Sequence, residues 1–488
     1  MTSSSSRSPS SEPPLLEVTG ACPLDCPDGC SWKVTVDAEG VATKLRGNAD
    51  HPFTRGGLCK KVNPWLSYAA DPGRLLAPLR RVGPKGDGRF VEISWDDALA
   101  EMAERLGQVI ERYGGQAIWP FVGTGNVGWI QGASGFADAR LWHRLGASRH
   151  LVSICSISGH VGLSYTAGEA ATFDLEDLPE AGTVLIWGSN TLVANQHLWP
   201  FVEEARSRGA HVVAIDPVRT RTAARADRHL ALRPGTDGAL ALGLCRAVVE
   251  QGGADESFLS SRTVGWPEFA ESLDEWTPER TAELCGLEPA DVTSLAQHLA
   301  SNGPVAVKLG QGMQRHAFGG QAARVVSCLP AVLGSYGQVG GGLNYSTGAN
   351  YRFNTAARSR PDLRTGGHGR VLAMTNLGRN LLELEDPPVE ALVIAGANPL
   401  VSNPQTDLVR QGLSRSDLFT VAIDLYRTET AEFADLVLPS TMQHEQVELN
   451  DSFAHLYVNW NEPAVEPPGE CLSHTEILRR LATCMGLD

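Results

Sequence analysis

Four cysteines near the N-terminus constrain this chain more than any other feature. Cys22, Cys26 and Cys30 are separated by three residues each, and Cys59 follows after a gap of 28 residues. Three thiols so close in sequence must lie on one compact loop, which Cys59 closes from a neighbouring turn. Four thiolates gathered in this way can enclose a single metal centre.

Three kinds of site compete for this quartet. A [4Fe–4S] cluster needs four thiolates and tolerates uneven spacing, whereas structural zinc sites usually show two pairs of closely spaced ligands. Disulfides suit small secreted domains, but this chain is long and its start has no apolar signal-peptide core. The three-plus-one pattern favours the cluster, with zinc and disulfides as the alternatives.

Two lysines, Lys60 and Lys61, follow the fourth cysteine directly. The chain has only six lysines among 41 Lys and Arg residues, so arginine supplies nearly every other positive charge. A compact ammonium at this place could hydrogen-bond an organic cofactor beside the cluster. The alternative is a solvated charge pair.

Composition excludes several classes of partner. The net charge of −15 argues against nucleic acid or an anionic membrane surface, and no apolar run is long enough for a transmembrane helix. The length of 488 residues predicts two to four domains. We expect residues 1–18 to form a disordered tail rather than an export signal, and the protein to be cytoplasmic.

From about residue 180 the chain alternates apolar strands with helices, which predicts an α/β fold with mainly parallel, doubly wound sheets. Ligands of such sheets bind at the carboxyl ends of the strands, where glycine lets backbone amides approach a phosphate. The polar turns at these ends supply candidate nucleotide-binding residues: Gly188, Ser189, Asn190, Asp216, Arg219, Gly235 and Asp237. A later strand-and-glycine segment adds Gly310, Gly312 and Arg315.

A second alternating block ends in comparable candidates, Gly396, Asn398, Asp424 and Thr428. Two nucleotide-sized sites are therefore expected, one in each block. Neither block contains the G-x-G-x-x-G fingerprint of dinucleotide-binding Rossmann units, so we do not predict NAD or FAD.

Seven motifs in order resemble one family. They are the cysteine quartet with its trailing lysine, WDDAL, the GSN turn, DPVRTRTAARADRHLALRPGTDGAL, GQGMQRHAFGGQ, GANPLVSNP and TETAEFADLVLPSTMQHEQVELN. In this order they resemble catalytic subunits of the dimethyl sulfoxide reductase family, along nearly the whole chain from about residue 19. These are molybdenum or tungsten enzymes that carry bis(molybdopterin guanine dinucleotide).

The resemblance implies three domains. A [4Fe–4S] domain would span 19–78 and be joined by 446–488. An α/β domain with the second pterin-nucleotide site would combine 79–150 with 340–445. A Rossmann-like α/β domain with the first pterin-nucleotide site would span 151–339.

The resemblance also implies a mechanism. The metal would transfer an oxygen atom or take a hydride equivalent, and electrons would pass through the pterin to the cluster, with Lys60 between them. Asp216 and Asp424 would contact the guanine dinucleotide moieties. The cofactor carries such chemistry, while the protein orients it and tunes its potential.

The metal ligand is expected in the segment HLVSICSISGHVGLSY, and Cys155 is the candidate. A thiolate is a soft ligand that suits molybdenum or tungsten. The alternatives are an oxygen ligand from Ser156 or Ser158, or a buried apolar cysteine. His160 could move protons close to the metal, or it could be a satisfied core histidine.

The chain departs from the family pattern at two places. Formate dehydrogenases of this family have a histidine where Ser156 stands and an arginine where Thr347 stands, with Arg352 nearby but offset. Formate is therefore disfavoured, while thiosulfate, polysulfide, other oxyanions and N- or S-oxides stay open. Family members also continue into a C-terminal β-barrel-like domain, so we expect that domain from another polypeptide or a shortened form here.

Two classes of function follow. The first is an oxidoreductase that acts on a small molecule and passes electrons to a ferredoxin-like or other electron-carrier subunit. The second is a non-catalytic iron–sulfur electron-transfer or scaffold subunit related to the family.

Overall fold

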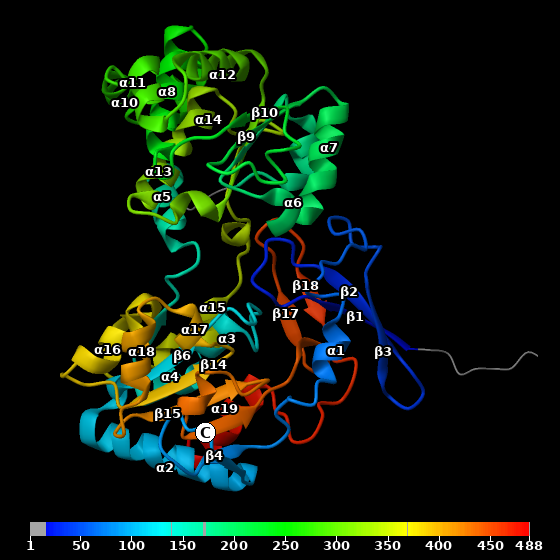
Figure 1. Ribbon diagram of the computed structural model, residues 1–488, viewed down its shortest axis with the longest axis vertical. Helices are drawn as coiled ribbons and strands as arrows, with labels where there is room; N and C mark the ends of the chain where they lie inside the picture. The colour runs from blue at the N-terminus through cyan, green and yellow to red at the C-terminus, as the bar shows by residue number, and fades with distance from the viewer. Residues whose placement is uncertain (1–15, 138, 169–171, 368, 488) are drawn as a thin grey trace, which may run out of the picture.

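The computed structural model describes residues 16–137, 139–168, 172–367 and 369–487. Residues 1–15 of the expected tail lie outside this part of the chain. The first strand begins at Leu16, so residues 16–18 belong to a sheet rather than to the tail. Three larger sheets organise the molecule: one at each end and the N-terminal sheet beside them (Figure 1).

The N-terminal sheet is antiparallel. Its strands are β1 (Leu16–Ala21), β2 (Ser31–Val36) and β3 (Ala42–Gly47), in that order. Asp37 Oδ1 accepts from the backbone N–H groups of Glu39 and Val41, and Gly40 has a φ of 80° that glycine adopts freely. The loop between β1 and β2 carries three cysteines of the quartet.

The second sheet has five strands, all parallel. Their order is β10 (Arg228–Leu230), β9 (His211–Ile215), β8 (Thr183–Trp187), β11 (Val305–Leu309) and β12 (Gly342–Asn344). Such a sheet must be covered on both faces. Along β11, Val305, Val307 and Leu309 enter one apolar cluster, whereas Ala306 enters another on the opposite face.

The third sheet has six strands. Their order is β5 (Phe90–Glu92), β4 (Leu79–Arg81), β16 (Leu436–Pro439), β15 (Phe419–Asp424), β14 (Ala391–Ala395) and β6 (Ile118–Val122), with β16 to β6 parallel. Side chains alternate strictly: Ile118 and Val122 face one cluster, and Trp119 and Phe121 face the other. Two short pairs, β7 (Arg149–Leu151) with β13 (Val371–Ala373) and β17 (Glu448–Asn450) with β18 (Asn459–Asn461), complete the strands.

Helices cover both faces of the two α/β sheets. The five-stranded sheet is covered by α5 (Ile157–Ala167), α7 (Trp199–Ser207), α8 (Asp237–Glu250), α11 (Pro278–Cys285), α12 (Pro289–Ser301), α13 (Gly319–Val326) and α14 (Cys328–Val332). The six-stranded sheet is covered by α2 (Trp95–Tyr113), α4 (Arg140–Leu145), α16 (Leu377–Glu383), α18 (Thr406–Leu413) and α19 (His474–Cys484). Helix α2 begins after the cap Ser94, whose hydroxyl accepts from Asp97 N–H, and it ends at Gly114.

The remaining helices are short and connect these layers. They are α1 (Trp65–Ala69), α3 (Ala133–Ala137), α6 (Thr191–Ala194), α9 (Glu256–Arg262), α10 (Trp266–Ser272), α15 (Thr355–Ser359) and α17 (Pro399–Ser402). Among the described residues, no helix is both long enough and apolar enough to cross a membrane.

Two expected domain limits differ from the structure. Strand β12 lies past residue 339 but pairs with β11 in the five-stranded sheet. The segment 446–488 divides: β17 and β18 lie beside β1 (Figure 1), but α19 packs against α2 on the six-stranded sheet. The reason is the apolar face of α19, where Ile477, Leu478 and Leu481 are buried in that core.

The two α/β sheets contain a repeated unit that the sequence analysis did not align. Strands β8, β9 and β10 correspond to β14, β15 and β16, with every counterpart 208 residues further along the chain. After the first strand of each copy, Gly188 and Gly396 have φ values of 60° and 54°, and both donate to the carbonyl of an isoleucine at the end of the next strand. The two copies therefore share their turn geometry as well as their strand order.

Side-chain hydrogen bonds of the repeated unit are also shared. Thr222 donates to Asn190 Oδ1 at 3.0 Å and accepts from Leu192 N–H at 3.0 Å. Thr430 donates to Asn398 Oδ1 at 2.7 Å and accepts from Leu400 N–H at 3.1 Å. Both threonines are fully buried, so each locks the turn that follows the first strand of its copy.

Candidate functional site

The four cysteines of the quartet line one cavity of about 510 Å³, which we call the cofactor cavity. The N–H of Cys22 donates to the carbonyl of Cys30 at 2.8 Å and closes the cysteine loop. Cys59 enters from the turn before α1, where its carbonyl accepts from Val62 and Asn63. The structure thus brings the quartet together as expected from the spacing.

The thiol chemistry of the quartet fits a metal centre. Burial, with the neighbouring acidic groups, raises the pKa of Cys22 and of Cys26 to about 12 and also raises the pKa of Cys30. Clustered thiols that resist ionisation gain most from a bound cation, because metal ligation deprotonates them. All ten cysteines, each in the described part of the chain, are free thiols, which does not support the disulfide alternative.

A buried polar network that the sequence analysis missed supports Cys30. His197 Nδ1 lies 3.0 Å from Asp28 Oδ2 and 3.8 Å from Cys30 Sγ. Asn195 donates to the other oxygen of Asp28 at 2.5 Å. A Cβ on Gly57 would lie 2.6 Å from His197 Nε2, so this histidine requires glycine there. Asp28 could be noticed from its place between two cysteines, but nothing local links it to His197.

The two lysines after Cys59 differ in their position relative to the cofactor cavity. Both lysines are exposed, but Lys61 lines the cofactor cavity and Lys60 is not part of its lining. Lys60 stays the predicted contact beside a cofactor, and Lys61 is a second candidate for that position.

The first nucleotide site is partly assembled in the same cavity. Its lining includes Gly188, Ser189, Asn190, Asp216, Gly310 and Gly312. A Cβ on Gly310 would lie 2.1 Å from the carbonyl oxygen of Gly188, so the two turns need glycine where they meet. The GSN turn and the cluster loop, which are distant in sequence, thus face one space.

Four expected residues lie outside this lining. Gly235 and Arg219 are exposed. Asp237 is buried, accepts from Trp187 Nε1 at 2.8 Å, and has a pKa raised by burial. Arg315 donates to the carbonyl of Ile154, in the segment just before Cys155.

The second candidate site repeats the first on the six-stranded sheet. Asn398 Oδ1 accepts from Thr430, and its amide donates to Glu429 at 2.7 Å. Asp424 ends β15 and accepts from Leu425 N–H at 2.7 Å, and burial raises its pKa to about 6. Thr428 Oγ1 accepts from the N–H of Ala431 at 3.3 Å.

A glycine turn meets Gly396 at the second site. The backbone N–H of Gly125 donates to the carbonyl of Gly396, and a Cβ on Gly123 would lie 2.9 Å from that oxygen. The sequence signal for this contact was the Gly-Thr-Gly run that follows β6.

Cys155 lies at the edge of the cofactor cavity. Its Sγ is 3.8 Å from Asp25 Oδ2 and 3.7 Å from Gln311 Oε1, and both of these residues line the cavity. Its carbonyl accepts from Gln314 Nε2 at 2.7 Å. Burial, followed by the Asp25 carboxylate, raises the pKa of Cys155, so its thiolate would need a cation beside it.

Residues after Cys155 define one side of the candidate site. His160 packs edge-on against Tyr345 with ring centroids 5.0 Å apart, and burial lowers its pKa. Tyr345 lines the cavity and donates to the carbonyl of Ser156 at 3.1 Å. Ser158 is exposed. Thr347 is fully buried and donates to the carbonyls of Ser452 and His455, so its hydroxyl stabilises the 452–455 segment.

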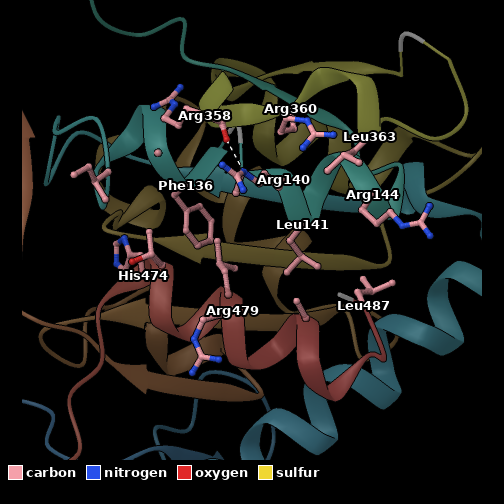
Figure 2. A pocket seen from close by; sticks show the side chains of 16 residues that line it. Phe136, Arg140, Leu141, Arg144, Arg358, Arg360, Leu363, His474, Arg479 and Leu487 are labelled. Carbon is pink, nitrogen blue, oxygen red and sulfur yellow. Dashed lines mark hydrogen bonds between the residues drawn. The ribbon is translucent and has the colours of Figure 1, made fainter. Parts of the chain in front are cut away.

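A second cavity, of about 660 Å³, lies away from all these residues. Figure 2 shows Arg140, Arg144, Arg358, Arg360 and Arg479 around an apolar floor that includes Phe136 and Leu141. None of the residues expected to bind cofactor or metal lines it. The quartet and the candidate residues of the first nucleotide site line the cofactor cavity instead.

Comparison with known proteins agrees with this site. Residues 74–484 match the family model described as molybdopterin oxidoreductase, and residues 16–70 match the molybdopterin oxidoreductase Fe4S4 domain. The chain is 39% identical over 465 residues to the probable oxidoreductase YoaE of Bacillus subtilis (strain 168), covering 95% of this chain and 68% of that protein. It is 27% identical over 531 residues to the dimethyl sulfoxide reductase DmsA of Escherichia coli (strain K12), covering 96% of this chain and 64% of that protein.

A solved structure shares the fold. Acetylene hydratase from Pelobacter acetylenicus superposes with a TM-score of 0.81 at 24% identity, covering 96% of this chain and 69% of that chain. Together with the family models, this likeness confirms the mainly parallel α/β fold with an N-terminal iron–sulfur domain. The chain is an enzyme that belongs to the molybdopterin oxidoreductase family.

Proposed function

We propose that the enzyme holds molybdenum or tungsten through two molybdopterin guanine dinucleotides and passes electrons through a [4Fe–4S] cluster. The observation that carries this proposal is the pair of equivalent turns 208 residues apart. The first turn lines the same cavity as the four cysteines. The second repeats its glycine, asparagine and threonine geometry, so a second nucleotide of the same kind has matching contacts.

Each copy of the repeated unit supplies the residues that would hold one nucleotide. In the first copy, Gly188, Ser189, Asn190 and Asp216 would contact one nucleotide, with Gly310 and Gly312 opposite. In the second copy, Gly396, Asn398, Asp424 and Thr428 would contact the other. When bound, the metal–pterin group supplies two-electron oxo-transfer or dehydrogenase chemistry. The protein's part is to bind, to orient and to exclude water.

Cys155 is the proposed metal ligand, since its Sγ lies at the edge of the cofactor cavity beside the cluster loop. His160 is the proposed proton carrier, because its ring packs against Tyr345, which lines the cofactor cavity. Lys61, which lines the cofactor cavity, is the proposed contact between the cluster and the pterin, with Lys60 as the alternative. We also propose that formate is disfavoured as substrate and that an electron-carrier protein is the redox partner.

The three-domain division is part of the proposal, with the limits adjusted as described above. The cluster domain then includes β17 and β18, and α19 belongs with the six-stranded sheet.

The first test is elemental analysis of protein purified without oxygen, with acid release of the pterin followed by fluorescence. We expect about four irons, with about one molybdenum or tungsten and two pterins per chain. Iron without either heavy metal or pterin would instead favour the non-catalytic electron-transfer subunit. Zinc in place of iron would reject the cluster.

The role of Cys155 is tested by Cys155→Ala. We expect this variant to keep its iron and pterin while dye-linked turnover falls at least about a thousandfold, which corresponds to about 4 kcal/mol in the barrier. Ser164→Ala is the matched control on the exposed face of α5 and should turn over normally. Full activity in the Cys155 variant would reject its role as ligand.

A further inference from the structure

Lys308 is a buried lysine inside the cofactor cavity that the proposed chemistry does not use. It is only 4% exposed, and it lines the cavity together with the four cysteines and the GSN turn. It is also the only lysine after residue 85. In a chain that otherwise uses arginine, a lysine in the middle of an apolar strand is an exception that needs a reason.

The strand determines where this side chain lies. In β11, Val305, Val307 and Leu309 enter the core on one face, so alternation places Lys308 with Ala306 on the other. Lys308 pairs in register with Asn344 of the neighbouring β12. Its ammonium therefore reaches the cavity from the end of the strand, just before the Gly310–Gly312 turn.

The protein satisfies little of this charge. Nζ donates to Asn344 Oδ1 at 2.8 Å, and Asn344 in turn donates to the carbonyl of Phe173. Among the residues that the structure describes, no carboxylate forms an ion pair with Lys308. An ammonium has three N–H donors, and a buried charge with a single neutral partner is costly. Burial accordingly lowers the pKa of Lys308 to about 8, although Asp28 opposes the shift.

Lys85 shows how the same fold treats a structural lysine. It is also buried, but its Nζ lies 3.0 Å from Asp435 Oδ2 and donates to the carbonyl of Leu418 and to Thr420. Lys85 thus has a carboxylate and two further acceptors, whereas Lys308 has one amide. The contrast indicates that the partner of Lys308 is a group bound in the cavity.

We propose that Lys308 is a positioning residue whose ammonium contacts an anionic group bound in the cofactor cavity and holds it against the cluster loop. The anion is either a phosphate or sulfur of the pterin cofactor or the sulfur of the reduced cluster, since both place negative charge in this space. The inference rests on the proposed function and adds a second cationic contact to it, besides Lys61.

The test compares wild type, Lys308→Met and Lys85→Met, all purified without oxygen. Pterin per chain, iron per chain and the midpoint potential of the cluster are measured. We expect Lys308→Met to lose at least about two thirds of its pterin with its iron retained if the anion belongs to the cofactor. If the anion is the cluster, pterin is retained and the midpoint potential falls. Lys85→Met should lower only the thermal midpoint.

Wild-type pterin content together with wild-type potential in Lys308→Met would overturn the inference. If that variant does not fold, Lys308→Gln keeps a hydrogen-bond donor toward Asn344 without the charge and decides the question by the same readouts. If wild-type protein contains iron but no pterin, the proposed function fails on its own, and the change in cluster potential still decides the role of Lys308.

Discussion

At the scale of single residues, the cofactor cavity depends on which of two adjacent side chains faces it. Lys61 lines the cavity and Lys60 does not, although the sequence treats them alike. Asp237, a predicted cofactor-binding residue, is buried and accepts from Trp187. The chemistry of a site thus depends on side-chain direction as much as on residue type.

The lysine pair yields a matched prediction. Lys61→Met should lower the midpoint potential of the cluster, because a cation beside the thiolates stabilises the added electron. We expect a shift of about 20–60 mV, where 59 mV is a tenfold change in the equilibrium constant of a one-electron couple. Lys60→Met, at the position outside the cavity lining, should leave the potential unchanged. Equal shifts in an EPR-monitored titration would contradict the assignment of Lys61 to the cavity.

Asp424 predicts a pH dependence of stability. Burial raises its folded-state pKa to about 6 from the ordinary value of 3.8, so between these values the folded state binds more protons than the unfolded state. The free energy of unfolding must then fall as pH rises through this window, by about 1–3 kcal/mol. Asp424→Asn should remove that fall.

Urea denaturation of cofactor-free protein between pH 4 and pH 7 measures the effect of Asp424. Asp417→Asn, at a carboxylate that pairs with Arg415 on the surface, is the control. A pH profile that Asp424→Asn leaves unchanged would show that this carboxylate ionises normally.

At the scale of elements, the repeated unit makes the glycine-and-asparagine turns much stronger evidence for nucleotide binding than either turn alone. A glycine-and-asparagine turn after a strand is common. Two such turns with equal spacing to an aspartate and to a buried threonine are a much more specific observation. They also explain why the chain lacks a Rossmann fingerprint: the turn is locked by a threonine 32 residues further on.

The two threonines should contribute equally to stability. Thr222→Val and Thr430→Val each remove a hydroxyl and leave a backbone N–H and an asparagine oxygen without their partner, which costs about 1–3 kcal/mol. Urea midpoints report the loss. Thr293→Val, on an exposed face of α12, should change the free energy of unfolding by less than about 0.5 kcal/mol. If neither variant lowers the free energy of unfolding, the two threonines do not stabilise the turns.

At the scale of the whole molecule, buried contacts join segments that are far apart in the chain. Arg74 donates from both terminal nitrogens to Glu445 at 2.6 and 2.5 Å, and both side chains are 2% exposed. Arg74 lies just before β4, and Glu445 lies just before β17, so the pair joins two segments that are distant in the sequence. It holds the iron–sulfur part of the chain to the six-stranded sheet.

Arg74→Met should therefore destabilise the protein strongly. It leaves the Glu445 carboxylate buried without its cation, which costs about 3–5 kcal/mol. Calorimetry would show a lower melting temperature for the sheet that this pair supports. The double variant Arg74→Met/Glu445→Gln should recover part of the loss, because the uncompensated charge is removed. Additive losses in the double variant would argue that the two side chains act independently.

The sequence by itself determined the features that depend on local spacing. The cysteine quartet and the strand–helix alternation each need only neighbouring residues, because hydrogen bonding and side-chain period are local properties of the backbone. Tertiary structure alone decided which residues meet: Cys155 with Asp25, His197 with Cys30, and Lys308 with Asn344. These pairs are separated by 130, 167 and 36 residues. The energies that bring them together come from burial in the shared cores, which no local pattern of spacing records.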